Sequence, residues 1–192
     1  MQRCNWTKTN ELMIKYHDEE WGVPLHDDLK HFEFIVLDTF QAGLSWQIVL
    51  NKREGFRKAF DNFIPEKIVK FSETRILKLL EDSTIIKNKL KIHATINNAK
   101  AFLNICEKYG SFDKYIWQFV DGKTIINSWK ELKELPPKTA ISDKMSKDLI
   151  KHGFKFAGST TCYAYMQAAG MVNDHFVSCF RYNEINQIIN GK

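Results

Sequence analysis

Residues that break helices are scarce in this sequence. Nine glycines and four prolines make up about 7% of the 192 residues, against about 12% in average proteins. A sandwich or barrel of many short strands needs more turns than this composition supplies. Strict alternation of polar and apolar residues, the pattern of half-buried strands, is also almost absent. The composition therefore predicts an all-α fold.

Cysteines and long apolar runs are scarce as well. The four cysteines, at positions 4, 106, 162 and 179, are too few for a disulfide scaffold. The first residues lack the apolar run of a secretory signal. The longest uncharged stretch, residues 156–173, contains Ser, Thr, Gln and Asn, which is typical of a buried helix and not of a membrane span. We expect a cytoplasmic protein that does not associate with membranes.

The charge balance is mildly basic. The chain has 28 Lys and Arg against 23 Asp and Glu, which gives a net charge of +5. This excess permits a polyanionic partner such as nucleic acid without requiring one. No linker, repeat or low-complexity segment divides the sequence, so we expect a single domain over residues 1–192. Nothing indicates a protein partner, and we expect a monomer.

Helix signals recur along the whole chain. Good caps such as Asp27, Ser72, Asn88 and Ser142 precede apolar residues at three-to-four spacing, and Gly110 follows the longest such segment. Residues 122–137 are the least regular part and are expected to form a loop. We expect helices over about 28–41, 45–60, 65–71, 72–80, 88–109, 112–120, 142–152 and 158–171, and a short one opening at Asn173 and Asp174.

Four possible metal ligands lie at the two ends of the chain. Cys4 and His17 are near the start, and His175 and Cys179 are near the finish. On a helix, the spacing of His175 and Cys179 would place both side chains on one face, one turn apart. Two thiolates and two imidazoles suit tetrahedral Zn²⁺ with no open position, which would be a structural site. Spacing alone also permits the alternative that the two ends never meet.

Aromatic residues gather in the first 46 residues. Trp6, Tyr16 and Trp21 precede an apolar segment that ends at Trp46 and contains Asp38. One alternative is that Asp38 is exposed on the polar side of its helix, which is usual for a lone Asp. The other is that it is an anion in an apolar pocket walled by aromatic rings. Such a pocket would favour a flat cation through charge pairing and stacking.

A third segment, residues 151–161, suits the binding of phosphate. A helix ends at Gly153, a short apolar turn containing Lys155 follows, and Gly158 begins a new helix. The first turn of that helix contains Ser159, Thr160 and Thr161, whose hydroxyls and backbone N–H groups could bind a DNA phosphate. Helix–hairpin–helix DNA-binding units have this layout. An ordinary turn between two well-capped helices is the alternative.

Together these segments resemble the 3-methyladenine DNA glycosylase I family of the helix–hairpin–helix superfamily. The resemblance extends from residue 3 to residue 179. The matching strings are Arg3-Cys4-x-Trp6, Tyr16-His17-Asp18-x-Glu20-Trp21-Gly22-Val23-Pro24, Gln41-Ala42-Gly43-Leu44-Ser45-Trp46, Gly153-Phe154-Lys155-Phe156 and Val172-Asn173-Asp174-His175.

The resemblance implies a zinc site, a base pocket and a DNA surface. One structural Zn²⁺ would join the terminal segments 4–17 and 175–179 through Cys4, His17, His175 and Cys179. Gly43 and Leu44 would lie near the unstacked base, and a helix–hairpin–helix unit over about residues 142–171 would grip the backbone through the residues of the phosphate-binding segment. The alkylated base would contact Asp38, Tyr16 and Trp46, which we predict to be catalytic, and Trp6, Trp21 and Gln41, which we predict to bind substrate.

The implied activity is excision of 3-methyladenine from alkylated double-stranded DNA. The base would be flipped into the pocket, its N-glycosidic bond hydrolysed, and free 3-methyladenine released from an abasic site. We predict no lyase activity because no lysine is obviously placed to form a Schiff base. The family has Glu where this chain has Asp38, which keeps the charge but shortens the side chain by one methylene, about 1.5 Å.

Two other classes of protein share part of the pattern. A non-catalytic DNA-binding module held together by zinc would need the turn at residues 153–158 and the lysines but no aromatic pocket. A zinc hydrolase would need an open metal position, which four protein ligands do not leave. Neither class accounts for three tryptophans and a carboxylate within 46 residues.

Overall fold

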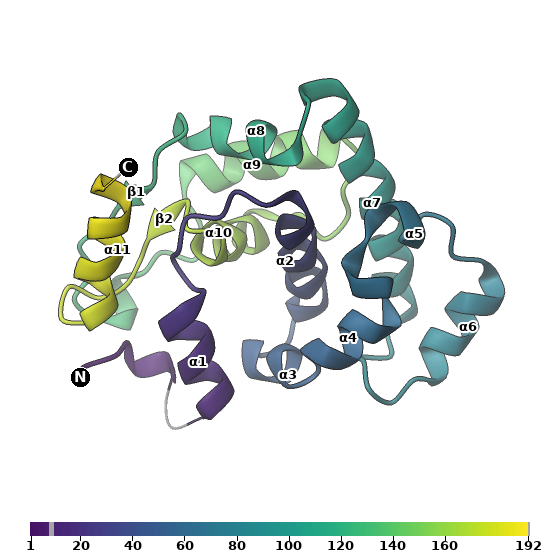
Figure 1. Cartoon of the computed structure of the whole chain (residues 1–192), viewed down its shortest axis with the longest axis horizontal. Helices are drawn as coiled ribbons and strands as arrows, with labels where there is room; N and C mark the ends of the chain where they lie inside the picture. The colour runs from purple at the N-terminus through teal and green to yellow at the C-terminus, as the bar shows by residue number, and fades with distance from the viewer. Residues whose placement is uncertain (8–9, 192) are drawn as a thin grey trace.

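The computed structural model describes residues 1–7 and 10–191. It confirms the predicted all-α class: the described residues form mainly helices, with a single pair of two-residue strands (Figure 1). The α-helices are α1 (Glu11–Glu19), α2 (Asp28–Gln41), α3 (Trp46–Asn51), α4 (Arg53–Ala59), α5 (Pro65–Ile68), α6 (Glu73–Glu81), α7 (Lys89–Tyr109), α8 (Phe112–Trp117), α9 (Ala140–Lys151), α10 (Ser159–Ala168) and α11 (Phe180–Asn190).

Local capping chemistry determines most helix boundaries. The side chains of Asp27, Ser72 and Asn88 accept hydrogen bonds from the third residue after each, and so begin α2, α6 and α7. Gly110 ends α7 with a φ of +87°, a conformation that costs glycine little. These boundaries are the ones that the sequence predicts, because a cap and its partner are neighbours in the chain.

Two predicted helices differ in detail. The helix expected from Ser45 to about residue 60 is broken at Lys52, whose φ of −104° and ψ of 4° separate α3 from α4. The cap of α9 is Thr139 and not Ser142. Ser142 is the third helical residue and bonds back to the Thr139 backbone, which completes a reciprocal capping box.

The strand pair lies partly within a segment that was predicted to be loop. Strands β1 (Ile125–Ile126) and β2 (Val172–Asn173) are parallel, with Ile125 opposite Val172. Two residues are too few to show alternation in a sequence, so the pattern did not predict them. The pair holds the connection between α8 and α9 against the segment that follows α10.

The prediction of a short helix opening at Asn173 and Asp174 is wrong. Residue 173 belongs to β2, residues 174–179 form a turn, and the last helix, α11, begins only after Cys179. The backbone N–H of Cys179 donates to the carbonyl of Phe176 at 2.8 Å, which closes this turn.

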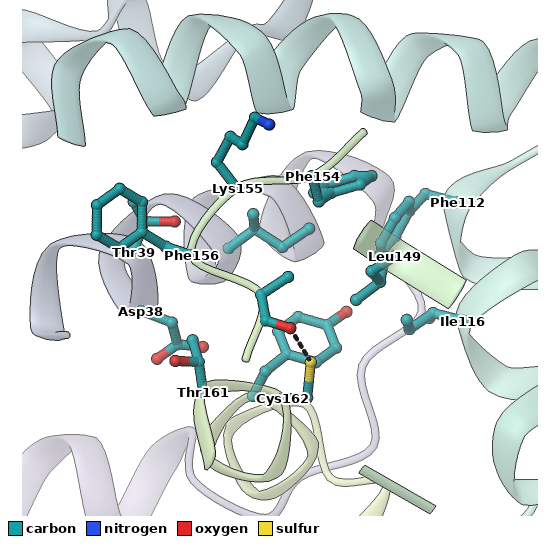
Figure 2. A pocket seen from close by; sticks show the side chains of 13 residues that line it. Asp38, Thr39, Phe112, Ile116, Leu149, Phe154, Lys155, Phe156, Thr161 and Cys162 are labelled. Carbon is teal, nitrogen blue, oxygen red and sulfur yellow. Dashed lines mark hydrogen bonds between the residues drawn. The ribbon is translucent and has the colours of Figure 1, made fainter. Parts of the chain in front are cut away.

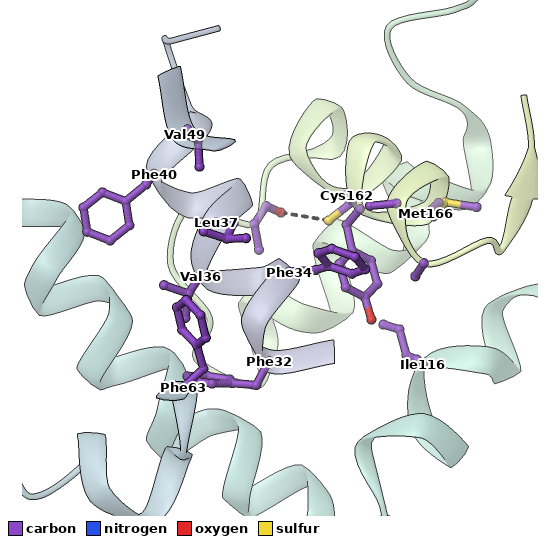
Figure 3. Packing of buried hydrophobic residues seen from close by; sticks show 14 of the residues in the cluster. Phe32, Phe34, Val36, Leu37, Phe40, Val49, Phe63, Ile116, Cys162 and Met166 are labelled. Atoms are coloured by element: carbon purple, nitrogen blue, oxygen red, sulfur yellow. Dashed lines mark hydrogen bonds between the residues drawn. The ribbon is translucent and has the colours of Figure 1, made fainter. Parts of the chain in front are cut away.

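The core surrounds α2, which lies in the middle of the molecule (Figure 1). Phe32, Val36, Leu37 and Phe40 of this helix are fully buried. Figure 3 shows side chains of neighbouring helices packed around them, among them Val49, Ile116, Cys162 and Met166. Asp38 belongs to the same helix, so the packing that buries α2 on several sides also buries this carboxylate.

Candidate active site and metal centre

Four potential metal ligands come together from the two ends of the chain. The donor atoms of Cys4, His17, His175 and Cys179 all lie within 4.8 Å of one another, and all four side chains are buried. The Sγ of Cys179 is 3.4 Å from Nε2 of His17 and 3.6 Å from Nδ1 of His175. The Sγ of Cys4 is 3.7 Å from the same Nδ1. The two ends therefore meet, which spacing alone left open.

These distances fit a tetrahedral metal site. With Zn–S of about 2.3 Å and Zn–N of about 2.0–2.1 Å, neighbouring sulfur and nitrogen ligands of zinc lie about 3.5 Å apart. Each imidazole also has a partner for its other nitrogen: Asp18 for His17 at 2.7 Å, and the Trp21 carbonyl for His175 at 2.9 Å. Such partners orient the remaining nitrogen toward a metal.

The ligands are positioned by a turn and not by one helical face. His175 and Cys179 lie at either end of the turn between β2 and α11, whereas His17 is in α1. The backbone N–H of Phe176, within the turn, donates to Cys4 Sγ at 3.4 Å. The predicted ligands thus come together through a different local structure from the one that the spacing suggested.

A cavity of about 190 Å³ lies beside this centre. It is smaller than the roughly 300–1,000 Å³ of typical small-molecule sites, so it suits a compact ligand. It contains all six residues that we predicted to be catalytic or substrate-binding. Its lining residues are Trp6, Met13, Tyr16, Trp21, Asp38, Gln41, Trp46, Leu132, Leu135, Ala164 and Gln167.

Aromatic rings form two pairs in the wall of this aromatic cavity. The ring centres of Tyr16 and Trp46 lie 5.0 Å apart, as do those of Trp6 and Trp21. Trp6 packs edge-on against His17 at 5.3 Å, and Trp21 packs against His175 at 4.6 Å. The candidate metal centre therefore supports one aromatic wall directly.

Asp38 is buried in the wall of the aromatic cavity, and one of its carboxylate oxygens has no hydrogen-bond partner among the described residues. Its side chain is 4% exposed, and Oδ2 has no hydrogen-bond partner among the described residues. Burial raises the pKa of the Asp38 carboxyl well above its usual range. Nε1 of Trp46 is likewise buried without an acceptor in the described part of the chain. Burying an unpaired acceptor and an unpaired donor costs free energy, and a ligand that carries both a donor and an acceptor can satisfy them.

Tyr16 contributes a neutral hydroxyl. Burial, and secondarily the charge of Asp38, raise the pKa of the Tyr16 phenol well above its usual value. The phenol therefore keeps its proton at neutral pH. Tyr16 can stack on a ligand or donate a hydrogen bond to it.

A second, smaller cavity of about 30 Å³, the small apolar cavity, is also lined by Asp38 (Figure 2). Its lining is mainly aliphatic and aromatic, from α2, α8, α9, α10 and residues 154–157. Figure 2 shows Asp38 beside Thr161, whereas Lys155 points away from the cavity. The lining of the small apolar cavity contains few polar groups that could pair with Oδ2, so we expect its partner to be a ligand in the aromatic cavity.

The predicted DNA-contacting residues form two exposed connections. In the turn after α2, Gly43 has a φ of +79° and Leu44 is 40% exposed. Residues 152–158 join α9 to α10, with Gly153 at a φ of +95°. Gly158 begins α10 as its N-terminal cap, and Ser159, Thr160 and Thr161 form the first turn as expected.

Several supporting residues were missed by the sequence analysis. The side chain of Asn98 in α7 bonds to both the N–H and the carbonyl of Lys155, at 2.8 and 3.1 Å. Asp174 accepts four side-chain hydrogen bonds and thereby fixes the segment that carries Leu132 and Leu135 into the aromatic cavity. Its donors are Asn127, Trp129, Tyr163 and Gln167. The only sequence signal for Asp174 was its place in a string that matches the glycosylase family. Most of its hydrogen-bond partners are distant in the sequence.

None of the described helices is both long and apolar enough to cross a lipid bilayer.

Comparison with known proteins gives a consistent result. Residues 6–182 match the family model described as methyladenine glycosylase. The chain is 45% identical over 182 residues to DNA-3-methyladenine glycosylase 1 of Escherichia coli K12, covering 95% of this chain and 97% of that protein. A crystal structure of a 3-methyladenine DNA glycosylase I superposes with a TM-score of 0.90 at 47% identity, covering 93% of this chain and 98% of that one. The Staphylococcus aureus 3-methyladenine DNA glycosylase I, solved to explain 3-methyladenine recognition, gives 0.90 at 33% identity, covering 94% and 96%.

Proposed function

The chain belongs to the methyladenine glycosylase family, and on that premise we propose that it hydrolyses the N-glycosidic bond of 3-methyladenine in alkylated double-stranded DNA. The observation that carries this proposal is the buried carboxylate of Asp38, with an unpaired oxygen in an aromatic cavity. A relative that binds 3-methyladenine has the same fold. The product is free 3-methyladenine, and an abasic site remains in the DNA.

The cavity selects its base by charge. Methylation at N3 gives the adenine ring of the nucleotide a positive charge, so the ring gains a charge-assisted contact with Asp38 that a neutral adenine does not. Tyr16 and Trp46 stack on the ring, with Trp6, Trp21 and Gln41 completing the pocket. The cation in turn lowers the raised pKa of Asp38 and favours its ionised form. Binding and ionisation therefore reinforce each other.

The reaction needs little acid catalysis. The bond between the sugar carbon C1′ and N9 breaks, and its electron pair passes to the ring, which becomes neutral. A water oxygen bonds to C1′ and loses a proton to solvent. The carboxylate of Asp38 stabilises the positive charge that is shared between the base and the sugar as the bond breaks. No lysine of the described residues lines the aromatic cavity, so we expect that no Schiff base forms and that the DNA strand stays intact.

Two connections would hold the DNA. Leu44, exposed beside Gly43, would fill the space that the flipped base leaves. Residues 142–171 would act as a helix–hairpin–helix unit that binds the backbone through Gly153, Lys155 and the start of α10, where Gly158, Ser159, Thr160 and Thr161 present donors. The enzyme would work as a monomer in the cytoplasm.

Cys4, His17, His175 and Cys179 would hold one Zn²⁺. Bound there, the ion supplies no reactive chemistry, because four protein ligands leave no open position. The four residues join the two ends of the chain and brace Trp6 and Trp21 in the wall of the aromatic cavity.

The proposal is tested by incubating the protein with methylated duplex DNA and identifying every released base by chromatography. We expect 3-methyladenine from the wild type. We expect Asp38→Asn to lower the rate by about 10²–10³, the usual loss when one electrostatic contact to a transition state is removed. Asp38→Glu keeps the charge and should remain active. Equal rates for all three proteins, or an adduct trapped by borohydride, would contradict the proposal.

A further inference from the structure

An open groove of about 450 Å³ lies between α7 and the connection that joins α9 to α10. We call it the α7 groove; it is lined by Leu90, His93, Ala94, Asn97, Lys155 and Phe156. Leu90 is 73% exposed and Phe156 is 37% exposed. An exposed aromatic ring next to a cation is the combination that binds unstacked bases of nucleic acids.

Phe156 has a strained backbone although its ring is partly exposed. Its φ is +56°, in the left-handed region that favours glycine. Phe63 also has a positive φ, of 58°, but its ring is 2% exposed and contributes to the core. A glycine at position 156 would adopt this turn without strain. Strain that persists at an exposed side chain points to a role for that side chain.

The ring of Phe156 is supported from behind. On its inner side it lines the small apolar cavity together with Asp38 and Thr39 (Figure 2). The Nζ of Lys91 lies 5.9 Å from the ring centre. The outer side of Phe156 lines the α7 groove. The ring is therefore a supported surface with one side open to a ligand.

The α7 groove is linked to the aromatic cavity by direct contacts. Gln41 lines that cavity, and the carbonyl of the next residue, Ala42, accepts a hydrogen bond from Lys91 at 2.6 Å. Lys91 in turn lies beside Phe156. The groove thus adjoins the turn that carries Gly43 and Leu44.

We propose that the α7 groove is a second nucleotide-binding site, which holds the unpaired base opposite the flipped nucleotide. Phe156 and Leu90 contact the base, and Lys155 pairs with its phosphate. The inference rests on the proposed function, because flipping one nucleotide leaves its partner base unpaired. Stacking on Phe156 stabilises the opened duplex and offsets part of the cost of flipping.

The test uses a duplex with a tetrahydrofuran abasic analogue and 2-aminopurine as the opposite base, whose fluorescence reports stacking. We expect the wild type to change this fluorescence on binding. Phe156→Gly, which suits the backbone of the turn, should abolish the change and weaken binding at least about fivefold. Phe156→Tyr should restore both. At saturating enzyme, the single-turnover excision rate of Phe156→Gly should fall as well, because stacking on Phe156 no longer offsets part of the cost of flipping.

Phe119→Ala is the matched control. It removes an aromatic ring from a lysine-lined groove on another part of the surface and should change neither signal. The inference is overturned if Phe156→Gly binds and stacks like the wild type, or if the fluorescence change occurs only when 2-aminopurine lies beside the abasic site in the same strand. Release of 3-methyladenine by the wild type tests the proposed function separately. If the wild type releases no base, the proposed function is wrong. If it releases the base but Phe156→Gly gives the same fluorescence change as the wild type, only the proposal for the α7 groove is wrong.

Discussion

At the scale of single residues, Asp38 lowers the stability of the folded protein but favours binding of a cationic base. Its carboxyl group is buried, and Oδ2 lacks a hydrogen bond among the described residues. An anion in such a place destabilises the folded protein, whereas the same anion attracts a cationic ring. We therefore expect an uncharged side chain at position 38 to make the protein more stable and less active.

We expect Asp38→Asn to raise the free energy of unfolding at pH 7 by about 1–3 kcal/mol, because the amide cannot ionise and so avoids the cost of a buried, unpaired anion. Burial raises the pKa of Asp38 in the folded state, so the folded chain binds the proton more tightly than the unfolded chain. The penalty is absent below the unfolded pKa of about 3.9 and grows as the pH rises toward the folded pKa. Urea unfolding at pH 3.5 and pH 7 measures the difference.

The control for this prediction is Asp121→Asn. Asp121 is exposed and has a φ of +51°, which Asn also tolerates. Its unfolding free energy should differ little from that of the wild type at both pH values. A wild type that is as stable as Asp38→Asn at pH 7 would show that the carboxylate is satisfied in solution.

The pH dependence of excision follows from the same group. Because the pKa of Asp38 is raised in the free protein, kcat/KM should fall on the acid side with a midpoint above the usual carboxyl range. The residual activity of Asp38→Asn should lack this acid limb. Rates on methylated duplex between pH 4.5 and 8 provide the measurement, and an identical limb in both proteins would assign it to another group.

At the scale of helices, a buried lysine fixes the end of α2. The Nζ of Lys91, in the first turn of α7, donates to the carbonyls of Phe40 and Ala42 at 2.7 and 2.6 Å. Cations at a helix C-terminus satisfy its free carbonyls and interact favourably with its dipole. Lys91 thereby determines where the turn with Gly43 and Leu44 begins.

We expect Lys91→Met to lower the free energy of unfolding by about 1.5–3 kcal/mol, since hydrogen bonds from a charged donor are lost. Binding to duplex containing an abasic analogue should weaken as well, because the turn after α2 loses its support. Thermal unfolding and fluorescence anisotropy measure the two effects. Lys89→Met, an exposed neighbour in the same helix, is the matched control, and equal losses in both variants would contradict a capping role.

The helices also show what a sequence can predict. Caps such as Asp27 and Asn88 bond to residues three positions away, so local patterns located α2 and α7 correctly. The turn over residues 174–179 was mistaken for a helix because the spacing of His175 and Cys179 fits both structures. The roles of Asn98 and Asp174 depend on partners that only the tertiary fold brings near, as do the cavity contacts of Leu132 and Leu135. No local signal encodes such partners.

At the scale of the whole molecule, the chain ends are joined at the candidate metal centre. The two termini lie on the same side of the molecule, next to α1 and α11 (Figure 1). A link between Cys4 and Cys179 encloses nearly the entire chain, and a crosslink that closes so long a loop removes much entropy from the unfolded state. A metal bound there would also hold the histidines against Trp6 and Trp21, so stability and pocket shape would depend on one feature.

Removal of the metal should therefore affect both properties. We expect the purified protein to contain one zinc per chain by elemental analysis. Cys179→Ser should lose the zinc and unfold with about 3–5 kcal/mol less free energy, by analogy with a crosslink of this loop length. That corresponds to a melting temperature about 6–20 °C lower. Cys106→Ser, at a half-buried cysteine outside the centre, is the control and should keep the metal. Excision by Cys179→Ser should fall through weaker binding of the base, because the wall of the aromatic cavity loosens while Asp38 remains. A zinc-free Cys179→Ser protein as stable as the wild type would show that the ends of the chain hold together without the ion.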